Sequence, residues 1–382
     1  MDAALTTYDA AICGAGPVGL ALAALLAKRG MAPARIALVD AKALGQAIAD
    51  PRSIALSYGS RLLLEEIGAW PLPATAIHQI HVSRRGHFGR SVMDHAEHDL
   101  PALGYVTRYG ELVAALAGAC ERAGVTAIRP ARVAGADEDT GGVSLRLEDG
   151  RALRCALVVQ AEGGVFGEQA AKGVQRDYRQ TALIARVSVS APAAHRAYER
   201  FTEEGPLALL PQDDADGHQY ALVWCVRPER AAALLAQDDA TFLARLGEAF
   251  GTRMGRFTAA SARASYPLGL NADARATART VAIGNAAQTL HPVAGQGLNL
   301  GLRDAAVLAR LLAQGATPAQ LAAFGDARDA DRKLTVGLTD TMARVFAQPG
   351  PGQALLGLSL GILDTVAPAR SLLAELMMFG RR

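Results

Sequence analysis

The stretch AAICGAGPVGLALAALLAKRG, residues 10–30, decides the fold of this chain. Residues 9–13 are a short apolar run that predicts a strand, and the Ala- and Leu-rich residues 17–29 predict a helix that stops at Gly30. Residues 35–39 predict a second strand, which ends at Asp40. A strand, a helix and a strand in about thirty residues predict a right-handed βαβ unit with parallel strands.

The turn of this unit, residues 14–19, has the pattern GxGxxG. In that pattern Gly14 permits a tight turn, Gly16 lets a pyrophosphate approach the backbone, and Gly19 lets helix and strand pack closely. Asp40 can accept hydrogen bonds from ribose hydroxyls, and its charge disfavours the 2′-phosphate of NADP. A glycine-rich turn without a ligand is the alternative, and this motif alone does not separate NAD from FAD.

A second glycine-rich segment, IGNAAQTLHPVAGQGLNLGLRDA, spans residues 283–305. It predicts a short strand, a turn through His291 and Pro292, and a long helix from Gly297. Asn285 can hydrogen-bond a ribityl hydroxyl, and the helix N-terminus can stabilise negative charge on a reduced flavin. Since a nicotinamide dehydrogenase has no need of this second element, the pair of motifs favours FAD.

Several further stretches carry a resemblance to a known family. They are DPRSIALS (50–57), ERFTEEGPLALLP (199–211), SYPL (265–268), the block at 283–305 and TDTMARVF (339–346). With them the chain resembles the group A flavoprotein monooxygenases, which have the p-hydroxybenzoate hydroxylase fold, and within these the hydroxylases of ubiquinone biosynthesis. Asn285 and Gln288 resemble the 2-polyprenyl-6-methoxyphenol hydroxylase subgroup, whose sister enzymes carry Asp and His there.

The resemblance implies an α/β fold with interleaved domains. A Rossmann-like FAD-binding domain is expected at residues 1–77, 103–178 and 275–350. A β-sheet substrate domain is expected at residues 78–102 and 179–274, and a C-terminal helical segment at residues 351–382.

The resemblance also implies a reaction. FAD is reduced by NAD(P)H or another electron donor, it reacts with dioxygen, and a flavin hydroperoxide hydroxylates the ring of a polyprenylated (methoxy)phenol. The family's middle motif, Ala-Asp-Gly, is Ala161-Glu162-Gly163 here, and this departure bears on the electron donor rather than on FAD. Two alternatives stay open: the same chemistry on another aromatic substrate, and a non-catalytic flavoprotein scaffold of a biosynthetic complex.

Two residues are candidates for catalysis by this resemblance, although the sequence names no catalytic base. Arg52 is expected beside the mobile flavin, with a surface arginine as the alternative, and Arg108 is either a cofactor contact or a solvated arginine. His291 either tunes the ionisation of the phenol or holds the turn. The expected cofactor contacts are Gly14, Ala15, Gly16, Pro17, Val18, Gly19, Asp40, Arg52, Arg108, Val133, Glu162, Gly163, Asn285, Pro292, Gly295, Gln296, Gly297, Leu298 and Asn299.

Composition excludes several other classes of protein. The net charge of +2 on 382 residues gives no basic surface for nucleic acid, and the four cysteines form no CxxC pair. The string from Asp94 to Asp99 resembles a metal cluster at first sight, but a solvated hairpin tip is the favoured explanation, and no metal site is expected. The N-terminus predicts no signal peptide, so a bacterial cytoplasmic protein is expected.

The C-terminal part of the chain is conspicuously apolar. Residues 352–363 are nearly uncharged, and Leu372, Leu373, Leu376, Met377 and Phe379 continue this character up to Arg381 and Arg382. Such a segment suits peripheral contact with a membrane surface, while a helix buried against the FAD-binding domain is the alternative. A ubiquinone-biosynthesis protein complex is the other partner that the resemblance implies.

Coarse secondary structure follows from periodicity and turn residues. A loop and a helix are expected at 50–70, a hairpin at 78–99, a helix at 111–123 and a β-meander at 125–161. Further strands are expected at 181–189, 206–211, 220–227 and 281–283, and further helices at 241–250, 297–312, 318–346 and 368–378.

Overall fold

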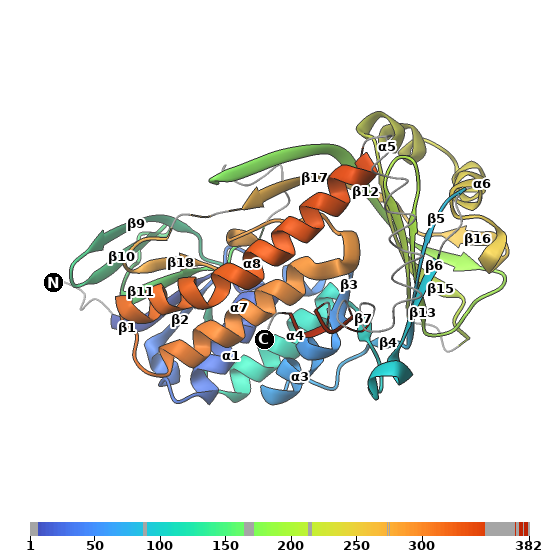
Figure 1. The fold of residues 1–382 in the computed structure, drawn as a ribbon. Coiled ribbons are helices and arrows are strands. Elements are labelled where there is room, and N and C mark those ends of the chain that lie inside the picture. The colour runs from blue at the N-terminus through green and yellow to red at the C-terminus, as the bar shows by residue number, and fades with distance from the viewer. Residues whose placement is uncertain are drawn as a thin grey trace.

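The computed structural model describes residues 7–86, 90–163, 172–212, 216–272, 274, 276–347, 371, 374–376 and 378–380. Two large sheets lie side by side, and long helices pack along the first sheet and reach its junction with the second (Figure 1). A three-stranded sheet lies near this junction and consists of β3 (Ser53–Ser57), β7 (Gly104–Arg108) and β4 (Thr75–Ile77).

The first sheet has seven strands and a mainly parallel core. Its parallel strands are β8 (Ala127–Ile128), β2 (Ile36–Val39), β1 (Thr7–Cys13), β11 (Ala152–Gln160) and β18 (Thr280–Ala282). Its antiparallel strands are β10 (Gly142–Leu147) and β9 (Val133–Asp139). The order is β8-β2-β1-β11-β10-β9, with β18 beside β11. The predicted βαβ unit is confirmed, because β1 pairs in parallel with β2.

Helices cover this sheet. They are α1 (Pro17–Lys28), α2 (Leu44–Ile48), α3 (Tyr58–Glu66), α4 (Tyr109–Arg122), α7 (Gln296–Leu312) and α8 (Pro318–Ala347). Pro17 favours helix initiation at the first position of α1. Leu20, Leu22 and Leu25 on different sides of α1 are all buried, as expected of a helix enclosed between a sheet and other helices. Both α4 and α7 pack on α1, and α8 packs on α7 (Figure 1).

The second sheet has eight strands. They are β16 (Phe257–Ala260), β12 (Val174–Val189), β15 (Gln219–Val226), β14 (Pro206–Pro211), β13 (Arg196–Phe201), β5 (Gln79–Arg84), β6 (Arg90–Asp94) and β17 (Ala264–Ala272), the last of which pairs with β12. One face packs under α5 (Pro228–Leu235) and α6 (Asp239–Phe250), with Tyr198, Trp224 and Phe242 in the core. The opposite face, through Val223 and Cys225, contacts Leu290 and Val336 of the helical layer.

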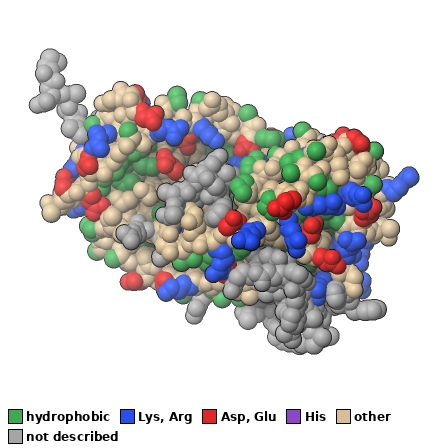
Figure 2. Space-filling model, turned by 90° about the horizontal axis from the view of Figure 1, so that it is seen from above, with side chains coloured by type: hydrophobic (Ala, Val, Ile, Leu, Met, Phe, Trp, Pro, Cys, Tyr) green, Lys and Arg blue, Asp and Glu red, His purple; other side chains and the backbone are tan. Residues whose placement is uncertain are grey.

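Single-turn 3-10 helices connect these elements: η1 (Pro33–Arg35), η2 (His95–His98), η4 (Thr252–Met254), η5 (Gly284–Ala286) and η6 (Val293–Gly295). None of the helices in the described ranges is both long and apolar enough to cross a membrane. On the face in Figure 2, acidic and basic side chains are interspersed over the described surface.

Six strands depart from the expectations from sequence, and β4, β7 and β16 are three of them. Residues 53–57 form β3, which pairs with β7, where a loop was predicted. The strands β13 and β17 were also not predicted. In β13 the sequence RAYERF is half charged, which argues against a strand, but Arg196 is satisfied by Gln79 on the neighbouring strand β5. Tertiary pairing therefore overrides local composition here.

Candidate active site

The first glycine-rich turn joins the end of β1 to α1. Gly14 has φ of +107°, which favours glycine, and a Cβ there would lie 2.6 Å from the backbone of Ala161, which directly follows the neighbouring strand β11. A Cβ on Gly19 would collide with the carbonyl oxygen of Gly14. No side chain caps α1 at Gly16, so its first backbone N–H groups stay available to an anion.

Asp40 supports this turn from the end of β2. Its Oδ2 accepts a hydrogen bond of 2.6 Å from the backbone N–H of Ala15, and its Oδ1 accepts one of 2.7 Å from that of Lys42. Since a carboxylate can accept about four hydrogen bonds, Asp40 keeps capacity for ribose hydroxyls. The residue therefore has a structural part as well as the cofactor part that the sequence predicted.

Arg129 is a residue of this site that the sequence analysis missed. It follows β8, and its Nη2 donates to the carbonyl oxygen of Ala15 over 3.1 Å. Its buried Nε and Nη1 have no hydrogen-bond partner in the described structure. Nothing in the local sequence marks Arg129, because only the pairing of β8 with β2 brings it to the turn.

Three other predicted residues lie at the ends of the neighbouring strands. Glu162 and Gly163 follow β11 directly, and partial burial, together with the charge of Asp40, raises the pKa of the Glu162 carboxyl. Val133 starts β9, where its half-buried side chain packs against the buried cluster that contains Cys13. The carboxyl ends of the parallel strands thus gather most of the predicted residues at one edge, where α/β sheets bind ligands.

The second glycine-rich segment packs directly on the first. Gly284, in η5, has φ of +59°, and a Cβ there would lie 3.2 Å from Val18 of α1. A Cβ on Gly301 of α7 would lie 2.8 Å from the same Val18 side chain. Asn285 is therefore placed beside the N-terminal turn of α1 and is half-buried. The two motifs form one continuous site, although Val18 and Gly284 lie far apart in the sequence.

The N-terminus of α7 forms the far end of this site. Pro292 precedes η6, and Gly295, with φ of +60°, is the residue before α7. Gln296, Gly297 and Leu298 form the first helical turn. At this position in a helix, backbone N–H groups have no carbonyl acceptor within the helix itself. A Cβ on Gly297 would meet nothing within 4 Å, so open space adjoins this turn.

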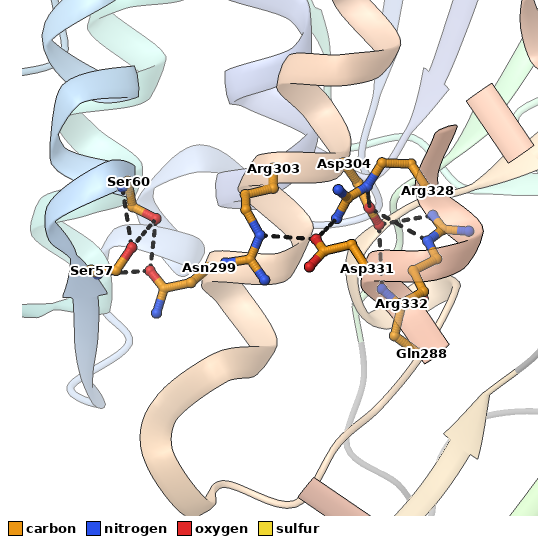
Figure 3. A network of polar contacts seen from close by, with 9 residues as sticks. All are labelled: Ser57, Ser60, Gln288, Asn299, Arg303, Asp304, Arg328, Asp331 and Arg332. Carbon is orange, nitrogen blue, oxygen red and sulfur yellow. Dashed lines mark hydrogen bonds and ion pairs between the residues drawn. The ribbon is translucent and has the colours of Figure 1, made fainter. Parts of the chain in front are cut away.

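Asn299 is another predicted cofactor contact, and its side chain makes hydrogen bonds to other groups of the protein. Its Oδ1 accepts hydrogen bonds from the backbone of Ser57 and from the hydroxyl of Ser60, at 2.8 and 2.7 Å. Its Nδ2 donates to the carbonyl oxygens of Ala55 and Gly295. All four hydrogen-bonding positions of the amide are occupied, so the side chain ties α7 to β3 and α3 (Figure 3).

A buried ionic network holds α7 against α8 (Figure 3). Asp304, with no exposed surface, pairs with Arg328 at 2.7 Å and with Arg332 at 2.8 Å. Arg332 also donates to the carbonyl oxygen of Ala282, at the end of β18. Gln288 donates to Asp304 as well, so the network supports the whole segment that carries Asn285.

Arg52 lies where β3 begins and faces the second sheet. Its Nη2 is 2.6 Å from Asp50 Oδ2, and its guanidinium lies over the rings of Tyr109 and Tyr266, 5.0 and 5.8 Å from their centroids. Although partial burial opposes it, the hydrogen bonds from Arg52 lower the pKa of the Asp50 carboxyl. Arg108 is half-buried at the end of β7, opposite Ser53 in the strand pair.

His291 is enclosed within the protein. Its Nδ1 accepts a hydrogen bond from the backbone N–H of Val293, and its Nε2 therefore carries the proton that is shared with Gln180 Oε1 over 3.0 Å. Burial lowers the pKa of His291 to about 4. These contacts favour the structural alternative, in which neutral His291 holds the turn before α7 against β12.

Comparisons with known proteins agree with this geometry. The family model described as FAD binding domain matches residues 7–333. The chain is 33% identical to ubiquinone hydroxylase UbiL of Rhodospirillum rubrum, over 95% of this chain and 88% of that protein. It is 32% identical to 3-demethoxyubiquinol 3-hydroxylase of Escherichia coli K12, over 80% and 79%. The chain belongs to the FAD-dependent hydroxylase family of ubiquinone biosynthesis.

The fold agrees with that of solved flavin monooxygenases. The structure of p-nitrophenol 4-monooxygenase PnpA from Pseudomonas putida superimposes with a TM-score of 0.75 at 19% identity, covering 99% of this chain and 100% of that one. The α/β fold with a Rossmann-like FAD-binding part, as expected from the sequence, is confirmed.

The residues present fit the FAD of this family. The unpartnered Nε and Nη1 of Arg129 and the uncapped α1 N-terminus offer donors to a diphosphate, and Asp40 offers acceptors to a ribose. At the other end, the open space beside Gly297 admits a flat ring edge against backbone N–H groups. The described residues thus offer donors for the phosphates and acceptors for the sugar of FAD.

Two other predicted features have different outcomes. In the string from Asp94 to Asp99, residues 95–98 form η2, and the described residues contain no group of three or more His, Cys, Asp or Glu side chains arranged for a metal. The apolar residues 352–363 lie outside the described residues, as do Leu372, Leu373, Met377, Arg381 and Arg382. Phe379 packs on Tyr58, with ring centroids 6.2 Å apart, which supports the buried alternative for that part of the segment.

Proposed function

We propose that this protein hydroxylates the aromatic ring of a polyprenylated (methoxy)phenol in ubiquinone biosynthesis, using FAD, dioxygen and NAD(P)H or another electron donor. The observation that carries the proposal is the contact of Val18 on α1 with Gly301 on α7, which joins a phosphate-binding helix N-terminus to a second one beside open space. Two such helix ends suit the two ends of one FAD.

Each part of the site has a task in this reaction. Bound FAD supplies the redox chemistry, namely acceptance of electrons from the donor and activation of dioxygen. The α1 N-terminus and Arg129 bind the diphosphate, Asp40 orients the ribose, and Asn285 orients the ribityl chain. The first turn of α7 stabilises negative charge at the ring edge through its N–H groups and helix dipole. The Arg52 guanidinium stays charged and borders the site from β3.

The face of the second sheet that is turned toward the FAD-binding part suits an apolar substrate. A recess of about 480 Å³, with its open mouth included, lies between β3, β5, β6 and the start of α7. Its apolar lining includes Ile77, Ile80, Met93, Leu103 and Met378, and Gln296 borders it on the α7 side. Apolar walls with few polar groups are typical of small-molecule sites, and they would exclude water from the ring.

The test begins with the purified protein. It should be yellow and should release FAD on heating or in acid, because no attachment residue is evident; colourless protein that FAD cannot reconstitute would contradict the proposal. Dioxygen consumption with NADH or NADPH should then rise on addition of 2-methoxyphenol carrying one prenyl group at position 6, with a hydroxylated product by mass spectrometry. A greater stimulation by unprenylated phenols would favour another aromatic substrate, and no stimulation by any phenol would favour the scaffold.

Contact with a membrane surface or with a biosynthetic complex is the second part of the proposal. A polyprenylated phenol is nearly insoluble in water, so the enzyme must meet it at a surface that holds it. Liposomes containing anionic lipid should co-sediment with the full chain more than with a chain ending at residue 350. If the full chain and the truncated chain are both folded, both contain FAD and sediment equally, residues 351–382 are not the membrane contact.

A further inference from the structure

Glu199 lies on the face of β13 that is directed toward the proposed cofactor site. Side chains of a strand alternate between its two faces, and Tyr198 points to the helix-covered face, where its ring packs on Phe250 at 5.5 Å. Glu199 therefore points the other way. Its neighbours in register on this face are Val82 of β5 and Ala208 of β14.

This face meets the turn that precedes α7. Phe201 and Val82 form a buried cluster with Val293 of η6, and Val223, two strands away from Glu199, clusters with Leu290. Glu199 therefore lies between these two clusters on the sheet. Its carboxylate is thus in the apolar wall opposite the turn from Leu290 to Gly297, which forms the ring end of the proposed FAD site.

The Glu199 carboxylate has no internal partner among the described residues. In the described parts of the chain no hydrogen bond or ion pair to it is present, although protein atoms surround it closely. The side chain is nevertheless only half-buried, so part of its surface is open to a ligand or to solvent. An unpaired carboxylate in an apolar wall is costly for folding, so its presence points to a ligand that completes it.

We propose that Glu199 binds the hydroxyl group of the phenol substrate and acts as its general base. This inference rests on the proposed function, because a phenol is the substrate class whose O–H group supplies the missing donor. As the ring is attacked by the activated oxygen, the phenol O–H bond breaks and its electron pair stays with the phenol oxygen, which makes the ring more electron-rich. The proton forms a new bond to a Glu199 oxygen. The C–H bond at the hydroxylated carbon then breaks, its electron pair restores the aromatic ring, its proton leaves to solvent, and Glu199 returns its proton to the phenol oxygen.

The electrostatics of the wall support this role. Burial raises the pKa of Glu199 to about 7, and a general base is most effective with a pKa near the working pH. Burial, together with the Glu199 charge, raises the pKa of the nearby Cys225 thiol, which stays neutral. The titratable or charged residues that share this face or pack against it include Arg84 on β5, Tyr178 and Arg186 on β12, Tyr266 on β17, Cys225 on β15, His291 before η6 and Asp340 on α8.

The experiment compares Glu199→Gln with a matched control, Glu203→Gln, which changes an exposed glutamate of the turn after β13. For Glu199→Gln, kcat/KM for 2-methoxy-6-prenylphenol should fall about 100-fold or more, while FAD affinity and thermal stability are retained. The acid limb of kcat/KM near pH 7 should be present in the unmodified protein and absent in the variant. The control should match the unmodified protein in every respect.

A second readout does not depend on turnover. Without a reductant, the oxidised protein should bind the same phenol with a near-ultraviolet difference spectrum that depends on pH around 7, and Glu199→Gln should lose this dependence. Equal kcat/KM and equal spectra in the variant would overturn the role of Glu199 and leave the proposed function standing. Failure of the unmodified protein to bind or hydroxylate any phenol would overturn both.

Discussion

Replacement of Arg129 by methionine separates a cofactor contact from a structural arginine. Arg129 lies beside the phosphate turn, where it makes one hydrogen bond among the described residues, to the Ala15 carbonyl oxygen, and its buried Nε and Nη1 have no partner there. Buried unpaired donors destabilise the cofactor-free protein. We therefore expect Arg129→Met to leave the stability of the FAD-free protein unchanged or to raise it, while it weakens FAD binding.

The size of the effect follows from the groups involved. A hydrogen bond to a charged group contributes about 1.5–3 kcal/mol, so the loss of one or more contacts to the diphosphate should weaken FAD binding about ten- to a hundredfold or more. Methionine keeps most of the apolar stem volume of arginine, so a cavity should contribute little.

Two measurements test this prediction: quenching of FAD fluorescence on titration with the FAD-free protein, and urea unfolding of the same preparation. Arg132→Met is the control, because Arg132 is 64% exposed and its ion pair with Glu148 lies at the surface. It should change neither quantity by more than about 1 kcal/mol. An unchanged FAD affinity in Arg129→Met, or a large loss of stability with normal affinity, would refute the assignment of Arg129 to the cofactor.

Three further predictions follow from individual contacts. Asp40→Ala should weaken FAD binding about ten- to a hundredfold, and Asp40→Asn less, because an amide oxygen can still accept the Ala15 N–H; fluorescence titration decides, and an unchanged affinity would mean that Asp40 does not bind the ribose. Asp304→Ala should lower the free energy of unfolding in urea by about 3–5 kcal/mol, since it removes the buried carboxylate that Arg328 and Arg332 share and leaves Arg328 with Asp331 alone, whereas the surface variant Asp329→Ala should cost under about 1 kcal/mol; similar losses would contradict the buried network. His291 has a pKa of about 4 in the folded protein against 6.5 ordinarily, so the unfolded chain binds the extra proton between these values. Stability should fall by up to about 1.4 kcal/mol per unit as pH drops from 6.5 toward 4, and His291→Gln should show a shallower slope in urea unfolding at each pH.

Local sequence was sufficient where a pattern has one physical explanation. The turn from Gly14 to Gly19 could be assigned because close backbone approach there admits only glycine, and α1 because its Ala and Leu residues favour a buried helix. The second motif was recognisable for the same reason, through Gly295 and the helix that follows. Family resemblance then extended these local assignments to the whole chain.

Other assignments depended on contacts that no local pattern carries. A loop was predicted at residues 53–57 because β3 exists only through its pairing with β7. His291 could be assigned to either of two roles until Gln180, distant in sequence, was seen to occupy its Nε2.

The sequence alone determined the cofactor class, the βαβ core and the family, because glycine geometry and helix periodicity act over a few residues. Only the tertiary structure decided which polar groups are satisfied and which are left open. Arg129 and Glu199 are ordinary charged residues in the sequence. They become candidates because folding places one beside the phosphate turn and the other in an apolar wall, each without the partners that a buried charge requires. Unmet hydrogen-bonding capacity is a property of packing, and for that reason no sequence pattern contains it.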